Sequence, residues 1–432
     1  RKFNNLGWNI PYDFNESDFA ISEDVLAIYL DEYEDTPWDA LKYLIAQANY
    51  GGRVTDDWDR RLMLVYISQF FAEDVLTVAN LPLSDSEYYF VPDDGELSNY
   101  ADYIRQLPLD DPPAAFGQHP NAQIASQIDD GRELLATILS LQALDVAEGG
   151  SGNDDLVLGL LQTLREAVPD VFDLPSIKLG LSARAEPDAL KTVLLQELER
   201  YNKLLATINS SVRALEKGIQ GSVVITPELE AVYNALLLGA VPTAWGFCYP
   251  SLKPLGPWTQ DLKLRCEQMT RWALHAQPAV FWLAGFTYPT GFLTALLQTA
   301  ARKNGLAIDS LNWEFLVLSQ PENALPSGPK DGAYVKGLIL EGARWDFDHD
   351  CLAEPLPMEL HCSMPILHFR PVEAKKKAAK GLYSCPLYMY PLRTGTRERP
   401  SFMIAVDLKA GSGKTPDLWT KRGTALLLSL ST

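Results

Sequence analysis

Residues 337–345 read GLILEGARW and lie in a part of the chain whose apolar residues recur with a period of two. That period is typical of β-strands, and the strand-like runs around the motif are bounded by Gly and Pro. The runs span residues 313–318, 335–340, 366–369, 387–390, 402–408 and 425–430. Short runs at this spacing predict a small antiparallel barrel or sandwich over residues 311–432.

The motif residues Gly337, Glu341, Gly342, Arg344 and Trp345 are interpreted as determinants of this fold. The two glycines permit a close approach of strands or a bulge, because they carry no Cβ. Arg344 beside Trp345 offers a stacked cation pair that would fasten the barrel. We therefore expect a structural role for the motif rather than a catalytic one.

A second marker lies at the opposite end of the chain. Residues 6–14 read LGWNIPYDF, residues 37–41 read PWDAL and residues 50–54 read YGGRV. The residues of this second marker that we expect to have a structural role are Leu6, Gly7, Trp8, Asn9, Trp38, Gly51, Gly52 and Arg53. The aromatic residues Trp8, Tyr12, Phe14 and Trp38 are interpreted as a local hydrophobic cluster rather than a platform for a ligand.

The N-terminal part is predicted to be helical, because capping residues precede apolar faces. Ser22 is the expected N-cap of a helix that runs to Tyr33, and Pro37 is the expected first residue of the next helix. Asp56 or Asp57 is expected to cap a third helix. These signals predict a small helical domain at the start of the chain.

Prolines between residues 81 and 123 block long helices there, apart from a short helix predicted at 97–106. One further helix is predicted at 133–142. Residues 147–153 have the Gly- and Ser-rich composition of a flexible linker. The main domain boundary is therefore expected near residue 145.

The part between residues 146 and 310 is predicted to be a helical bundle. From Pro187 to Ile219, apolar residues step alternately by four and three and form one stripe. The stripe lacks the regular flanking charge pairs of a coiled coil, which favours a bundle helix over a dimerisation helix. Further helices are predicted at residues 226–238, 258–276 and 290–304, the last ending at Gly305.

The 432 residues are 47% hydrophobic and carry a formal net charge of −19. This charge opposes binding to nucleic acid, which requires clustered Lys and Arg. The basic run at residues 375–380 could dock an acidic partner but is interpreted as a solvated loop.

No window approaches the roughly 18 consecutive apolar residues of a membrane helix, so we expect no membrane span. The five scattered Cys indicate reduced thiols, and a start without Met indicates a fragment whose true start lies upstream.

The sequence Gly-Ser-Gly413-Lys414-Thr415 invites a phosphate-loop interpretation, under which the protein would be a freestanding nucleotide-binding enzyme. The pattern fails because Leu408 stands where its first Gly is required. Pro416 also follows where the helix that donates amide groups should begin. An ordinary hairpin turn is therefore expected here.

Cys351, His361, Cys362 and His368 are suitable ligand types for zinc. Their spacing contains no Cys-x-x-Cys pair and no short His pair, and neighbours on a strand point to opposite faces. His119 is expected to make a turn contact rather than act as a base, since no nucleophile signature accompanies it. The sequence thus predicts no catalytic, cofactor-binding or metal-ligating residues.

Taken in order, the markers at both ends resemble those of dynein heavy chains. Further signatures of that family are FGQHPNA at residues 116–122, YSCPLY at 383–388 and WTKRGTALL at 419–427. The resemblance covers essentially the whole chain and weakens between about 145 and 185. It implies that residues 1–145 form the helical lid of the sixth AAA+ module with an extended linker. Residues 146–310 would then be the helical part, and residues 311–432 the β-barrel part, of the C-terminal domain.

The resemblance also implies a noncatalytic segment that braces and regulates the AAA+ ring of an ATP-driven, microtubule minus-end-directed motor. The tail, with YMYPLR at residues 388–393, is more similar to axonemal heavy chains, which implies ciliary or flagellar beating and a cytoskeletal location in the axoneme. The same region of a cytoplasmic heavy chain is the alternative. A self-contained adaptor that binds peptides or glycans is a candidate from another class.

The cofactors and partners of such a segment also follow from the resemblance. ATP and Mg²⁺ would bind elsewhere in the parent motor, and no cofactor would bind in this segment. The implied partners are neighbouring AAA+ modules of the same heavy chain, microtubules, and dynein intermediate and light chains. Neither nucleic acid nor a membrane is an expected partner.

Overall fold

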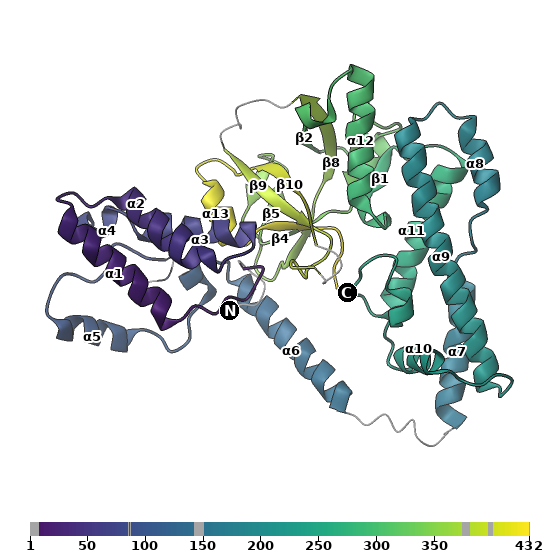
Figure 1. The fold of residues 1–432 in the computed structure, drawn as a ribbon, viewed down its shortest axis with the longest axis horizontal. Helices are drawn as coiled ribbons and strands as arrows, with labels where there is room; N and C mark the ends of the chain where they lie inside the picture. Colours follow the sequence, from purple (N-terminus) through teal and green to yellow (C-terminus); the bar gives the residue numbers. More distant parts are fainter. Residues whose placement is uncertain are drawn as a thin grey trace.

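A computed structural model describes residues 8–141 except 85 and 87, and residues 151–373, 381–395 and 401–431. Figure 1 shows the N-terminal helices on one side, a β-rich centre, and a helical bundle on the opposite side. Helix α6 leaves the centre and points towards the bundle. Within the described ranges, no helix combines the length and apolar character needed to cross a membrane.

The N-terminal part contains α1 (Glu16–Glu32), α2 (Trp38–Lys42), a π-helical turn (Tyr43–Asn49), a 3-10 turn (Tyr50–Gly52), α3 (Asp57–Phe70), α4 (Asp74–Thr77) and α5 (Leu97–Gln106). The prediction that Ser22 caps the first helix is wrong, because Asn15 caps it through reciprocal hydrogen bonds with Asp18. Ser22 lies inside α1 and donates its hydroxyl to the Asp18 carbonyl at 3.0 Å. Helix α2 begins one residue after Pro37. The sequence left Asp56 and Asp57 as alternative caps of the third helix, and the structure has Asp56 in that role.

Helix α6 (Asn121–Leu141) begins at residue 121, which is twelve residues before the start of the helix predicted at 133–142. Tertiary contacts hold its first turn in place. The Asn121 side chain donates to the carbonyls of Leu356 at 2.8 Å and Glu359 at 3.0 Å, and Ala122 is buried. Part of the predicted linker at 147–153 lies outside the described residues, and the remainder, from Ser151, already belongs to the next helix.

The bundle consists of α7 (Ser151–Ala167), α8 (Leu174–Ser182), α9 (Asp188–Ile219), α10 (Pro227–Leu237), α11 (Leu255–Leu274) and α12 (Pro289–Asn304). The long helix predicted from residue 187 is confirmed as α9, with its apolar stripe buried in the core of the protein. Packing within one chain supports the bundle interpretation rather than a dimeric coiled coil. The prediction that α12 ends at Gly305 is also confirmed, since Gly305 has a φ of 63°.

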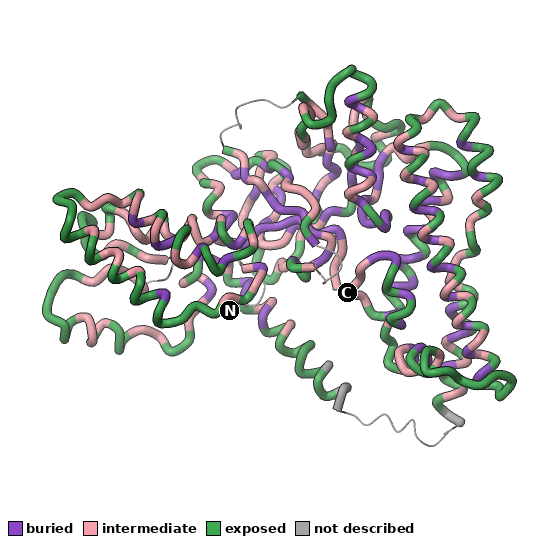
Figure 2. The backbone as a smooth tube through the Cα atoms, viewed as in Figure 1, coloured by how far each residue is buried: buried purple, intermediate pink, exposed green. Residues whose placement is uncertain are grey.

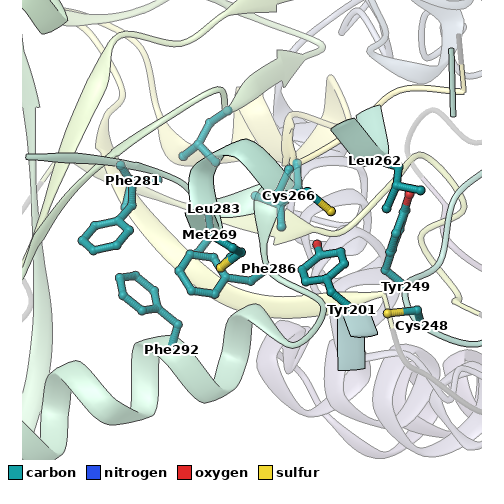
Figure 3. Packing of buried hydrophobic residues seen from close by; sticks show 14 of the residues in the cluster. Tyr201, Cys248, Tyr249, Leu262, Cys266, Met269, Phe281, Leu283, Phe286 and Phe292 are labelled. Atoms are coloured by element: carbon teal, nitrogen blue, oxygen red, sulfur yellow. The ribbon is translucent and has the colours of Figure 1, made fainter. Parts of the chain in front are cut away.

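Aromatic side chains fill the space between the bundle and the first sheet. Figure 3 shows Phe281, Phe286 and Phe292 facing one another beside Met269, with Tyr201 nearby. The ring centroids of Phe286 and Phe292 are 4.4 Å apart, and those of Phe281 and Phe292 are 4.6 Å apart. Aromatic pairs at such distances add to the stabilisation that area burial provides. This cluster fixes the bundle against the β-rich centre.

The β-rich centre contains two main sheets and one two-stranded sheet. The strands are β1 (Val280–Trp282), β2 (Leu311–Leu318), β3 (Ala333–Lys336), β4 (Ile339–Glu341), β5 (Arg344–Asp346), β6 (Cys351–Ala353), β7 (His361–Ser363), β8 (Ile366–Glu373), β9 (Leu382–Tyr388), β10 (Phe402–Lys409) and β11 (Ala425–Leu427), with helix α13 (Pro416–Lys421) between the last two. The strand orders are β1-β3-β8-β2, β10-β9-β11-β4-β7 and β5-β6. The helical N-terminal part, helical bundle and β-rich end that the sequence predicts amount to an α+β multidomain class, and the mixed helix and sheet content agrees with that class.

The prediction of a closed antiparallel barrel is wrong for the described residues. Their sheets are open, and β1 pairs with β3, and β11 with β9, in parallel. The run predicted at 335–340 is split, because Gly337 adopts a φ of 79° between β3 and β4. A residue in this conformation interrupts a strand, so the backbone leaves the first sheet and enters the second.

One continuous core joins the helical bundle to the β-rich centre. Its buried apolar residues extend from Val157 to Leu428. Figure 2 shows buried residues concentrated along the inner faces of the bundle and through the strands, whereas most residues of α5 and of the described part of α6 are exposed or half-buried. The second sheet presents β9 towards the N-terminal helices, and this contact positions the candidate site.

Candidate functional site

The N-terminal marker meets strand β9 at a contact that also involves helix α3. The Asn9 side-chain amide donates to the Tyr388 hydroxyl at 2.8 Å and to the Asp56 carboxylate at 3.1 Å. Asn9 and Tyr388 are both buried and are separated by 379 positions in the sequence. We use the name joint for the contact formed by Asn9, Asp56, Asp59 and Arg61 with Tyr383, Ser384 and Tyr388.

Asp59 holds the N-terminal segment onto helix α3. Its carboxylate accepts the backbone N–H of Asn9 at 2.6 Å and that of Ile10 at 2.9 Å, and the residue is 0% exposed. Burial in a low-dielectric environment raises the pKa of Asp59 to about 6, although both N–H donors oppose the rise. The joint therefore contains a carboxyl group that titrates near pH 6.

This pKa predicts a pH dependence of stability that Asp59→Asn should remove. Because the folded-state pKa lies above the ordinary value of 3.8, the folded protein binds the proton more tightly than the unfolded protein. The stabilisation is present below about pH 4 and is lost as the pH rises through about 6, by roughly 3 kcal/mol in all. Urea unfolding across this range should show wild type losing that free energy relative to Asp59→Asn. Parallel pH profiles for the two proteins would contradict the burial of a titrating Asp59.

Arg61 is the second fastening of the joint. It donates to the Ser384 carbonyl at 2.6 Å and to the Tyr383 hydroxyl at 3.0 Å. Its guanidinium carbon also lies 4.5 Å from the centroid of the Trp58 ring and 5.0 Å from that of Tyr383. Tyr383 in turn donates to the Thr424 carbonyl at 2.7 Å, and burial raises the pKa of its hydroxyl. One arginine thus links α3 to β9 by hydrogen bonds and by ring contacts.

A second line of contacts lies beside the joint, between residues 69–121 and the C-terminal segment. Arg422 donates to the Gly117 carbonyl at 2.7 Å and pairs with Glu354 at 3.1 Å. Lys421 donates to the Gln69 side chain at 2.7 Å. The N-terminal part is therefore attached to the β-rich centre at more than one place.

The GLILEGARW motif supports the joint from the strands behind it. Strand β4 of the motif pairs with β11, and β11 pairs with β9. Glu341 pairs with the buried guanidinium of Arg393, which also donates to the Gly423 carbonyl at 2.8 Å. A Cβ on Gly337 would lie 2.5 Å from the Trp282 ring, and one on Gly342 would lie 2.8 Å from a backbone oxygen, so both positions require glycine.

The predicted stacked pair of Arg344 and Trp345 is not found among the ring contacts of the described residues. Both residues belong to β5, where Trp345 is buried and Arg344 is half-buried. Successive side chains of a strand point to opposite faces, which separates the guanidinium from the ring. Trp345 instead belongs to the main core.

The N-terminal marker is only partly described, because Leu6 and Gly7 lie outside the described residues. Trp8 and Tyr12 pack at 5.7 Å between ring centroids, and Tyr12 and Phe14 at 6.0 Å, as expected for a local cluster. Trp38 instead packs against Phe71 at 5.3 Å, which places it between helices.

The remaining residues of the marker hold the turn between α2 and α3. Gly51 is buried, and a Cβ there would lie 2.7 Å from the Ala46 carbonyl oxygen, whereas Gly52 has open space around it. Arg53 pairs with Asp18 of α1 at 3.1 Å. Gly51 and Arg53 thus fix this turn against α1 and the π-helical turn.

The segment predicted to be a hairpin turn, residues 411–415, instead connects β10 to helix α13. The objection that no helix begins at Pro416 is wrong, since α13 begins there with Pro in its first turn, where proline fits. The other objection stands, because Leu408 is a buried strand residue. The Lys414 ammonium lies 4.9 Å from the centroid of the Trp419 ring.

The candidate zinc ligands are distributed over separate strands. Cys351 lies in β6, His361 and Cys362 lie in β7, and His368 lies in β8 with its ring nitrogen 2.8 Å from the Asp331 carbonyl. Among the described residues, no three His, Cys, Asp or Glu side chains are placed to hold a metal ion. The basic run at 375–380, with Lys375, Lys376, Lys377 and Lys380, lies outside the described residues.

His119 makes the turn contact expected of it. Its ring nitrogen accepts the Asn121 backbone N–H at 3.2 Å, directly before α6. Burial lowers the pKa of His119, which favours the neutral ring that can accept this bond. This geometry gives the ring a structural role at the start of α6.

The fold and the joint define a module of mixed helix and sheet in which a helical unit is fastened to the opposite end of the chain. The family model for the AAA lid domain of dynein heavy chains matches residues 1–122, and the model for the C-terminal domain of dynein heavy chains matches residues 128–428. The protein belongs to the dynein heavy chain family and corresponds to the C-terminal region of axonemal heavy chains. The resemblance inferred from the sequence markers is thereby confirmed.

Curated relatives match along the whole sequence. It is 55% identical to the Dynein-1-beta heavy chain, flagellar inner arm I1 complex, of Chlamydomonas reinhardtii over 436 residues, which is 100% of this chain and 10% of the relative. It is 53% identical to Dynein axonemal heavy chain 2 of Mus musculus, with the same coverage of both proteins. Identity to Dynein axonemal heavy chain 12 of Homo sapiens is 39%, over 100% of this chain and 14% of the relative. The protein described here therefore spans between 10% and 14% of the length of these relatives.

Proposed function

We propose that this protein is a noncatalytic segment that braces the AAA+ ring of an ATP-driven, microtubule minus-end-directed motor and regulates its motion. In this proposal residues 1–145 are the lid of the sixth module with its linker. Residues 146–310 and 311–432 are the helical and β-rich parts of the C-terminal domain. ATP and Mg²⁺ bind in other parts of the parent motor.

The joint is the observation that carries this proposal. Asn9, Asp59 and Arg61 belong to the proposed lid, and they bond to partners on β9 or hold the segment that does. Hydrogen bonds to charged groups contribute about 1.5–3 kcal/mol each. A lid held in this way moves with the C-terminal domain, so a displacement of one is passed to the other.

The cellular location that we propose for the motor is based on the named relatives, which are axonemal or flagellar heavy chains. This supports a role in ciliary or flagellar beating, within the axonemal cytoskeleton, over the same role in a cytoplasmic motor. The proposed partners are the neighbouring AAA+ modules of the same heavy chain. Through the parent complex they include microtubules and dynein intermediate and light chains.

Removal of the C-terminal domain tests the proposal. We expect a parent motor that ends at residue 145 to keep its ring in electron micrographs but to differ at least about twofold from the full motor in microtubule-activated ATPase rate or gliding velocity. Such a difference corresponds to a modest change in an activation barrier, which a regulatory brace can supply. Unchanged kinetics with an intact ring would contradict both bracing and regulation. Collapse of the ring would support bracing and contradict a separate regulatory role.

A further inference from the structure

A small pocket at the joint is lined by two arginines that lie far apart in the sequence. Arg61 enters it from α3 and Arg393 from the segment after β9, and Asn9, Tyr383 and Tyr388 complete much of the wall. The cavity volume is about 10 Å³, which is room for roughly one small guest. Both guanidiniums lie close enough to Cys385 to oppose the rise that burial gives to the pKa of its thiol. Both arginines line this one pocket, which places their positive charges near each other.

Each arginine leaves one buried donor without an acceptor. The terminal nitrogens of Arg61 bond to Ser384 and Tyr383, and one of those of Arg393 bonds to Glu341 and Gly423. The Nε–H groups of both side chains are buried and have no partner among the described residues. The Arg393 side chain is only 4% exposed, so bulk water does not solvate it freely. Buried donors of this kind normally have an acceptor.

The acidic groups around the pocket are already engaged. Glu341 pairs with Arg393 and also lies 3.8 Å from a His361 ring nitrogen. Asp59 accepts backbone N–H groups of the N-terminal segment, and Asp56 accepts those of α3. Arg61 has no carboxylate partner among the ion pairs of the described residues. The pocket thus presents two free donors and an unneutralised positive charge.

We propose that the pocket binds one small monovalent inorganic anion, of the size of chloride, between the Nε–H groups of Arg61 and Arg393. Each arginine donates one hydrogen bond to the ion, which accepts bonds without fixed direction. The ion joins a residue of the N-terminal helices to a residue of the C-terminal segment. Its binding therefore strengthens the joint and raises the stability of the folded protein by RT ln(1 + c/Kd), where c is the concentration of the anion.

Thermal unfolding of the 432-residue protein in sodium chloride and in sodium gluconate, at equal ionic strength, tests the proposal. We expect a chloride-specific rise in Tm of about 2 °C in wild type, which grows with the logarithm of the chloride concentration. Arg61→Lys keeps the charge but has no Nε–H, and it should lose this rise. Arg60→Lys alters the neighbouring, more exposed arginine and should keep it. Equal Tm values in the two salts, or an unchanged rise in Arg61→Lys, would overturn the proposal.

Diffraction from crystals grown in bromide gives a readout that does not depend on any variant. We expect an anomalous peak within hydrogen-bond distance of both Nε atoms. Density without anomalous signal at that position would mean that the guest is an ordered water only, which overturns the proposal. If circular dichroism shows that Arg61→Lys does not fold, Arg393→Lys replaces it in the salt comparison. If neither variant folds, the bromide experiment on the wild-type protein alone tests the proposal.

Discussion

Alanine at position 342 is expected to lower the free energy of unfolding of the protein by about 3–5 kcal/mol. Gly342 has a φ of 74°, which side-chain-bearing residues adopt only at a cost. A Cβ there would also lie 2.8 Å from the Arg422 carbonyl oxygen and 3.2 Å from the Thr424 Cα. Both neighbours are backbone atoms of the segment that leads into β11, so relief requires that strand to move. Urea unfolding followed by circular dichroism measures the loss.

Gly305→Ala separates the effect of conformation from the effect of crowding. Gly305 has a φ of 63°, close to that of Gly342, but a Cβ there has no neighbour within 4 Å. Its replacement should therefore cost only the conformational part, about 1–2 kcal/mol. If the two variants lose the same free energy, the close approach of Gly342 to residues 422–424 does not exist in solution.

Removal of the Glu197 side chain should have an effect of similar size, about 3–5 kcal/mol. The Glu197 carboxylate is 1% exposed and accepts the backbone N–H groups of Thr287 at 2.6 Å and Tyr288 at 3.1 Å. These groups directly precede α12, where the helix dipole favours a negative charge. Glu197→Ala leaves two N–H donors without their acceptor. Its ion pair with Arg200 adds little, because that side chain is 39% exposed.

Glu199 provides the matched control on the same helix. Its side chain is 53% exposed and pairs with Lys178 at 3.5 Å, so Glu199→Ala should cost less than about 1 kcal/mol. Glu197→Gln keeps one acceptor oxygen and should fall between the two alanine variants. The comparison uses thermal and urea unfolding of the 432-residue protein. A Glu197→Ala variant as stable as Glu199→Ala would show that Glu197 does not hold the start of α12.

Sequence patterns correctly predicted the elements that are specified by residues close together in the sequence. The apolar stripe of α9 and the capping residue Asp56 of α3 were each visible within a few turns of sequence. Whether the strands would close into a barrel or form open sheets could not be predicted in this way, because the pairing of strands depends on contacts between segments far apart in the sequence. Strand β1 (Val280–Trp282) is an example, since its three apolar residues lie between two predicted helices and pair with β3 more than fifty positions later.

The joint was visible only in part for the same reason. The markers contain Asn9 and Gly342, and the signature at 383–388 contains Tyr388, but none of these patterns names a partner. Arg61 and Asp59 resemble ordinary charged residues of an amphipathic helix. Their importance depends on bonds to Ser384 and to the backbone of Asn9, which only folding brings into contact. Arg393 likewise gives no local signal of its burial.

Steady-state kinetics of the parent motor carrying Arg61→Ala test most directly whether the joint braces the ring. Arg61→Ala removes the bonds to Ser384 and Tyr383, whereas Arg60→Ala removes a more exposed arginine of the same helix. With the ring intact in electron micrographs, we predict that Arg61→Ala changes gliding velocity or microtubule-activated ATPase rate at least about twofold relative to Arg60→Ala. Identical kinetics for the two variants would contradict the claim that the joint transmits motion between the lid and the C-terminal domain.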